Sequence, residues 1–190
     1  RQMCIRDRSN ADPKRTFLNL VSGEHLDNPF KESVGNIKLR GDFAKLFMAL
    51  DGKPEWACFK GEDPGTKDHG FIPIIPSLDY IEGSRLEAMK GVLPEKVWFL
   101  LQIQSLTDST LAPTGQNSMT CYIQSVPYEL SQGSWDDETL QNEFTEHCIN
   151  TLVEYAPNIR EILIDHVFFG PKNIEETFYL TESTMHHGDM

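Results

Sequence analysis

The segment from Ser134 to Asn158 is the longest stretch of this chain with a single clear period, and it constrains the fold more than any other. Apolar side chains recur every four residues, at Leu140, Phe144, Cys148 and Leu152. This spacing places one apolar stripe along a helix. An amphipathic helix of about five turns requires an apolar partner surface, and the strand-like runs that precede it are the natural candidates.

The expected ends of this helix follow from its flanking residues. Ser134 is predicted as the cap, with Asp137 three residues later in an acidic version of the capping box. Pro157 is expected to end the helix, because proline has no amide hydrogen to continue the ladder.

The rest of the chain alternates between strand-like and helix-like segments. Branched and aromatic residues predict strands over residues 43–50, 71–75, 97–104, 118–126 and 167–169. Shorter helices are expected over residues 13–23, 26–36, 78–89, 159–164 and 171–178. Pro73 restricts its strand to an edge or a bulge. The order predicts an α+β fold, with a mostly antiparallel, mixed sheet backed by helices.

The first of these helices is expected to begin at Pro13 and to end at Gly23. Its spacing places Phe17, Leu18 and Val21 on the buried side.

Composition bounds the class of protein. The chain has 190 residues, 39% of them hydrophobic, which fits one domain or a large part of one. Its formal net charge is -12, with 29 acidic and 17 basic residues and no basic cluster interleaved with aromatics. We therefore expect no nucleic-acid partner. No apolar run reaches the roughly 18 residues of a membrane span, so a cytoplasmic location is expected, with peripheral membrane contact left open.

Nucleophile and metal motifs are weak. The four cysteines form no CxxC pair, so we expect free thiols. His147 and Cys148 would diverge by about 100° on a helix, and Cys148 is predicted to be a core residue. The tail residues His186, His187 and Asp189 include metal-ligand types, but adjacent residues rarely point at one ion, and no metal is expected. Asp79 is interpreted as a surface acid near a helix start.

No phosphate-binding glycine loop of the GxGxxG or GxxxxGK[ST] type occurs in the sequence. Residues 1–8, RQMCIRDR, are interpreted as a non-native leader that is not expected to contribute to the fold. The residues alone therefore indicate an α+β fold but no specific biochemical function.

Four stretches together resemble one enzyme family, in one order along the chain. They are SNADPKRTF (9–17), IPSLDYIE (75–82), SMTCYIQSVPYEL with the following WDDE (118–138), and TLVEYAPN (151–158) with the terminal HGDM (187–190). The chain resembles the phytoene-desaturase-like FAD-dependent oxidoreductases, in particular the branch of pyridine nucleotide-disulfide oxidoreductase domain-containing proteins. The family often has Gly-Gly-Asn where this chain has Glu182-Ser183-Thr184.

The resemblance implies that the chain is an internal, substrate-domain part of a two-domain FAD oxidoreductase. Residues 9–12 would end the FAD-domain segment, and residues 13–190 would form an incomplete substrate-binding domain. The family's two glycine-rich FAD-binding segments are not in this sequence, so they are the expected partners of the chain. The cofactor-binding residues implied by the resemblance are Asn10, Ala11, Asp12 and Gly188, and the catalytic candidates near the flavin are His187 and Asp189.

The implied reaction transfers hydride from a C–H bond of an apolar substrate, carotenoid-like or isoprenoid-like, to the flavin. Such a protein must supply a dry apolar cavity. The candidate lining residues, expected to face one layer of the sheet, are Phe43, Phe47, Met48, Trp98, Leu100, Met119 and Tyr122. Ordinary core packing is the alternative for each. Two other functions stay open: a relative of the flavin amine oxidases, and a non-catalytic interaction module.

Overall fold

Five antiparallel strands form the centre of the structure, a computed structural model that describes residues 9–186 and 188. The strands are β1 (Phe43–Leu50), β2 (Phe71–Ile74), β3 (Phe99–Ile103), β4 (Asn117–Gln124) and β5 (Leu163–Phe169). They lie in the order β2-β3-β4-β1-β5, and all four neighbouring pairs are antiparallel. The predicted α+β class with an antiparallel sheet is therefore confirmed.

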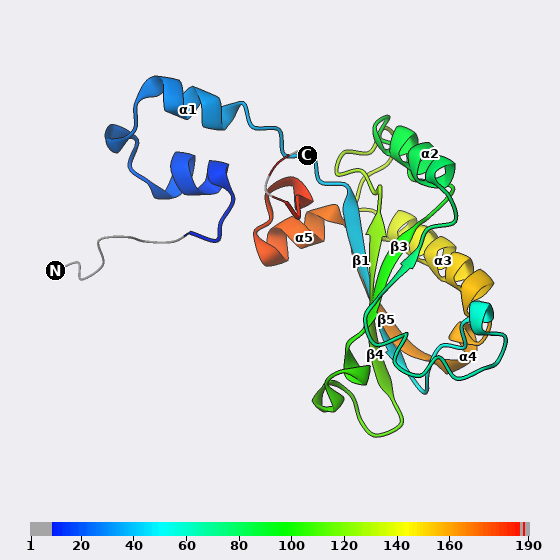
Figure 1. Cartoon of the computed structure of the whole chain (residues 1–190). Helices are drawn as coiled ribbons and strands as arrows, with labels where there is room; N and C mark the ends of the chain where they lie inside the picture. The colour runs from blue at the N-terminus through cyan, green and yellow to red at the C-terminus, as the bar shows by residue number, and fades with distance from the viewer. Residues whose placement is uncertain (1–8, 187, 189–190) are drawn as a thin grey trace.

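The helices divide between the two sides of this sheet. They are α1 (Asn28–Gly35), α2 (Leu78–Ala88), α3 (Glu138–Tyr155), α4 (Ile159–Ile162) and α5 (Pro171–Phe178). Figure 1 shows α2, α3 and α4 on one side of the sheet, and α5 with the N-terminal segment on the other. Only the first side is thus covered along the length of the strands.

Several sequence predictions are confirmed closely. Strand β2, which contains Pro73, is an edge strand, as its missing amide hydrogen requires. Ser77 caps α2 by accepting a hydrogen bond from the Tyr80 amide at 3.1 Å. The segments on either side of the 104–117 loop pair as the hairpin β3–β4. Strand β5 is longer than predicted, because it begins at Leu163 rather than at residue 167.

The predicted start of the long helix is wrong. Helix α3 is capped by Asp137, whose carboxylate accepts from the amides of Thr139 and Leu140 at 2.9 and 3.4 Å. Ser134 instead accepts from the Asp136 amide at 3.1 Å and forms a turn before the helix. Both residue types cap helices well, and the carboxylate has the added interaction with the helix dipole.

The N-terminal segment also departs from its prediction. Residues Arg15–Leu20 form a π-helical turn rather than an α-helix ending at Gly23. Leu18 is 42% exposed, so its predicted place on the buried side is wrong. Phe17 does pack, with its ring 5.0 Å from the Phe30 ring of α1 in an edge-on arrangement. The wider turn alters the angular spacing of side chains, so a 3.6-residue pattern misplaces them.

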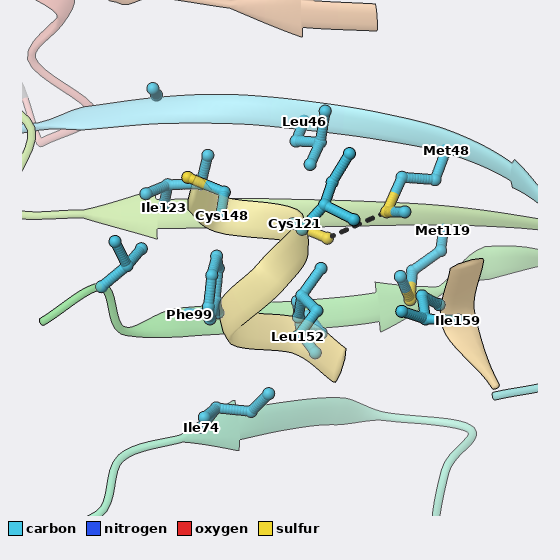
Figure 2. Packing of buried hydrophobic residues seen from close by; sticks show 14 of the residues in the cluster. Leu46, Met48, Ile74, Phe99, Met119, Cys121, Ile123, Cys148, Leu152 and Ile159 are labelled. Atoms are coloured by element: carbon cyan, nitrogen blue, oxygen red, sulfur yellow. Dashed lines mark hydrogen bonds between the residues drawn. The ribbon is translucent and has the colours of Figure 1, made fainter. Parts of the chain in front are cut away.

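The core lies between the sheet and α3. Alternate strand residues point to this side and have almost no exposed surface, among them Leu46, Leu101 and Cys121. Figure 2 shows Leu46, Cys121 and Phe99 of this face beside Cys148 and Leu152 of α3. Burying each large apolar side chain contributes about 1.5–3 kcal/mol. The predicted apolar stripe of α3 is therefore confirmed, and Cys148 is a core residue.

Candidate functional site

The second face of the sheet, here called the outer face, carries apolar and aromatic side chains that no long helix covers. Strand register assigns to it Phe43, Lys45, Phe47 and Ala49 of β1, Ser118, Thr120, Tyr122 and Gln124 of β4, Leu100 and Gln102 of β3, Phe71 and Pro73 of β2, and Asp165, Val167 and Phe169 of β5. Phe71 and Val167 are 61% and 52% exposed. A sheet face with exposed apolar and aromatic side chains among polar ones is a candidate binding surface.

Lys45 lies on this face between Tyr122 of β4 and Phe169 of β5. Its ammonium nitrogen is 4.8 Å from the centroid of the Tyr122 ring, 5.2 Å from that of Phe178 and 5.9 Å from that of Phe47. These distances are those of cation–π contacts. Burial among the rings lowers the pKa of the Lys45 ammonium from its ordinary value, because the charged form loses hydration.

Two groups of rings, from five elements, lie on either side of Lys45. The centroids of Phe47 and Phe169 are 5.5 Å apart, and those of Phe169 and Phe178 are 5.8 Å apart. On the other side of Lys45, the rings of Tyr122 and Phe71 are 6.2 Å apart. These are favourable edge or tilted geometries. The outer face thus carries aromatic rings on both sides of Lys45.

A hollow of about 520 Å³ lies at one end of the outer face, between the 104–117 loop and β5. We call it the distal hollow. Its lining includes Phe47, Ala49, Leu111, Pro113 and Val167, together with the polar groups Gln104, Asn117, Asp165 and His166. Its size and mostly apolar lining match those of small-molecule sites. Because Phe47 contacts both Lys45 and the hollow, the two are contiguous.

The predicted substrate-contacting residues divide between the two faces. Phe47, Leu100 and Tyr122 lie together on the outer face, and Phe43 shares it but is buried. Trp98 precedes β3 and donates from its indole nitrogen to the Ser125 hydroxyl at 3.1 Å.

The expectation that all seven predicted lining residues face one layer is wrong for two of them. Met48 and Met119 are paired on the core face and are 3% and 1% exposed. The reason lies in the strand period of two. Met119 and Tyr122 are three positions apart on one strand, and Phe47 and Met48 are adjacent, so neither pair can share a face.

The residues implied for the cofactor begin with Asp12, which ties the N-terminal segment to the tail. Its carboxylate accepts from the Thr181 hydroxyl at 2.5 Å and from the Arg15 amide at 2.9 Å. Asp12 is 2% exposed. Burial raises the pKa of this carboxyl, but the hydrogen bonds from Thr181 and from the amides of Arg15 and Lys14 outweigh burial, so the pKa is lowered.

Asn10 is exposed, and the Ala11 carbonyl accepts from the Thr16 hydroxyl at 3.2 Å. The structure thus brings segment 10–12 beside segment 181–184, which lies about 170 residues away in the chain. Gly188 lies beside Ile37, since a Cβ at this glycine would be 3.7 Å from the Ile37 methyl. His187 and Asp189 lie outside the described residues.

The segment at which the family often has glycine adopts a glycine-like backbone. Glu182 and Ser183 have φ angles of 51° and 57°, in the left-handed region. The Glu182 carbonyl oxygen would lie 1.6 Å from a Cβ at Gly41, so that glycine permits the contact. The Ser183 hydroxyl donates to the Phe43 carbonyl at 3.2 Å. The tail is therefore fixed directly to the start of β1.

Neither metal ligation nor membrane spanning has a candidate in the part of the chain that the structure describes. There, no three metal-ligating side chains converge on one point. No helix within residues 9–186 combines the length and the apolarity that crossing a bilayer requires.

Sequence reasoning did not identify Lys45 as a site residue. The signal was present, because Lys45 is the one charged residue in the apolar run FAKLFMAL. It could be taken for a solvated strand position, and only the register with Tyr122 and the return of α5 place three rings around it.

Comparison with known proteins supports the resemblance to the pyridine nucleotide-disulfide oxidoreductase domain-containing proteins. No family model matches the chain. The chain is 27% identical over 186 residues to the pyridine nucleotide-disulfide oxidoreductase domain-containing protein 2 of Rattus norvegicus. It is 27% identical over 187 residues to the protein of the same name from Mus musculus. Both matches cover 96% of this chain but 32% of the relative. The chain is therefore similar, over nearly all its length, to about a third of these oxidoreductase domain-containing proteins.

Proposed function

We propose that this chain forms the substrate-binding wall of an FAD-dependent oxidoreductase that removes hydride from a C–H bond of an apolar substrate. The observation that carries the proposal is the outer face, where Phe47, Leu100 and Tyr122 form an apolar surface with no long helix over it. The similarity to oxidoreductase domain-containing proteins adds independent support.

The described residues fit part of a flavin site. The three aromatic rings around Lys45 would border the substrate side of a flat ring system. The sequence offers no binding site for the phosphates of the cofactor, because it contains no glycine-rich loop at the start of a helix. FAD would accordingly be held mainly by segments other than these residues. From this chain, Asn10, Ala11 and Gly188 are the proposed contacts at its edge.

A bound flavin supplies the hydride acceptor. The protein groups described here would orient the substrate and exclude water. Phe47, Leu100 and Tyr122 would hold a flat or extended apolar molecule against the sheet, and the distal hollow would receive its far end. The contact of Asp12 with Thr181 would hold the two segments that approach the cofactor in register.

Two other functions are less consistent with this geometry. An amine oxidase binds an amine, which is cationic before reaction, and Lys45 would oppose a second positive charge on the outer face. A non-catalytic module would have no need of a desolvated cation within an apolar surface, since the cation costs folding free energy.

The visible spectrum of the purified full-length protein tests the proposal. We expect flavin absorbance near about 450 nm that bleaches when an oxidisable apolar substrate is added without oxygen. The 190-residue chain alone is expected to be colourless. Full-length protein without flavin would contradict the proposed function, and stoichiometric FAD on the chain alone would contradict the proposed location of the phosphate contacts.

A further inference from the structure

Lys45 is the one basic residue among the outer-face positions of the five described strands. Within residues 9–186 and 188 it makes no ion pair and no side-chain hydrogen bond. The acid on this face, Asp165, is paired with Ala49 and so lies four residues further along the strands. The Lys45 ammonium is therefore not neutralised by a described carboxylate.

This arrangement is costly for a surface that binds only hydrocarbon. A half-buried ammonium loses hydration, and the three rings replace only part of it. An apolar side chain at position 45 would serve a purely apolar ligand as well. A negatively charged group on the ligand would complement the ammonium, in a chain whose net charge of -12 otherwise repels anions.

The distal hollow and Lys45 lie on the same strand, β1. Lys45 and Ala49 are four residues apart, which is about 13 Å in a strand. Phe47 lies between them, contacting Lys45 on one side and lining the hollow on the other. A charged head group at Lys45 and an apolar body over Phe47 would thus lie in one line.

We propose that Lys45 is a specificity-determining residue that binds the carboxylate of an amphipathic substrate acid, whose apolar body extends over Phe47 into the distal hollow. This inference rests on the proposed function and narrows its substrate class, from apolar molecules in general to apolar carboxylic acids.

Calorimetry with full-length protein tests this assignment, with decanoate and its uncharged methyl ester as probes. We expect the wild-type protein to bind decanoate at least about tenfold more tightly than the ester, as expected for a hydrogen bond to a charged group. Lys45→Met should remove this preference and leave ester binding within about twofold. Lys45→Arg, which keeps the charge, should retain most of the preference.

Lys67→Met is the matched control, because Lys67 also lies over a ring, that of Phe59 at 5.4 Å, but not on the outer face. It should bind both probes as the wild-type protein does. Three results would overturn the assignment: no preference for decanoate in the wild-type protein, an equal loss of acid and ester binding in Lys45→Met, or an unchanged preference in that variant. If Lys45→Met fails to fold, the absence of a preference for decanoate in the wild-type protein would still overturn the assignment. Flavin absorbance, measured on the same samples, reports on the proposed function separately.

Discussion

At the scale of single residues, the contact between residues 181–184 and the start of β1 depends on the absence of a side chain at Gly41. Gly41 allows the Glu182 carbonyl to approach to a distance that any side chain would block. Beside it, Asp12 accepts a hydrogen bond from Thr181. These two contacts hold together the segments that we propose lie near the cofactor, and each can be tested alone.

Gly41→Ala should destabilise the protein by more than about 2 kcal/mol, because the new Cβ would lie 1.6 Å from a backbone oxygen. Gly35→Ala is the matched control, since a Cβ there meets no atom within 4 Å. Its free energy of unfolding should equal that of the wild-type protein or exceed it slightly. Urea unfolding measures both. Equal stabilities of the two variants would show that the tail does not lie against Gly41.

Asp12→Asn should reduce the dependence of stability on pH in the acid range. The pKa of Asp12 is lowered in the folded state, so the unfolded chain binds the proton more readily. The stabilisation is complete above the unfolded pKa of about 3.9 and is lost as pH falls through the folded value. The variant should lose about 1.5–3 kcal/mol at pH 7 and change less between pH 5 and pH 3.

Thr181→Val is the companion variant, because it removes the hydroxyl that donates to Asp12 and keeps the shape of the side chain. Together with Asp12→Asn it forms a double-mutant cycle, and the two effects should not add. Urea unfolding across this pH range measures all four proteins. If the free energy of unfolding of Asp12→Asn depends on pH as that of the wild-type protein does, the hydrogen bond between Asp12 and Thr181 is contradicted.

At the scale of elements, each strand places alternate side chains in the core and on the outer face. The segments themselves were largely predictable from sequence, since the apolar stripe of α3 and the strand-like runs were visible in the periodicity. The faces were less so. Met119 was grouped with Tyr122 although a separation of three residues places them on opposite faces, and the strand period alone could have corrected this.

Other features of the site could not be predicted from local patterns. The rings around Lys45 come from β1, β4 and α5, and their meeting depends on strand order and on how the chain returns after β5. Glu182 has a left-handed conformation that its residue type does not favour, and it lies against Gly41. Tertiary contacts of this kind leave no periodic signal in the sequence.

Neighbouring residues of β3 test the division between the two faces. Leu101 points to the core and is 0% exposed, whereas Leu100 lies half-buried on the outer face. Leu101→Ala should cost about 2–5 kcal/mol through the cavity it leaves. Leu100→Ala should cost less than about 1.5 kcal/mol but should weaken substrate binding in the full-length protein. Equal losses of stability, measured by urea unfolding, would mean that the outer face is ordinary core.

At the scale of the whole molecule, the chain is a sheet with one sealed face and one open face. The sealed face holds α3. The open face, which α5 covers in part, carries Lys45, the rings and the distal hollow. The relatives of which this chain matches 32% are about three times as long. We propose that the further residues of such a protein carry FAD to the open face. The stability of the sheet and the chemistry of the site would then depend on opposite sides of the same strands.

Cysteine labelling of Leu100→Cys measures most directly whether the outer face meets the flavin. The full-length protein, with its exposed native thiols replaced, is compared with flavin bound and with flavin removed. We predict slow labelling when flavin is bound and faster labelling after its removal, whereas Asn142→Cys on the exposed side of α3 labels equally in both states. Equal labelling of Leu100→Cys with and without flavin would contradict the proposal that this sheet face is the wall of the redox site.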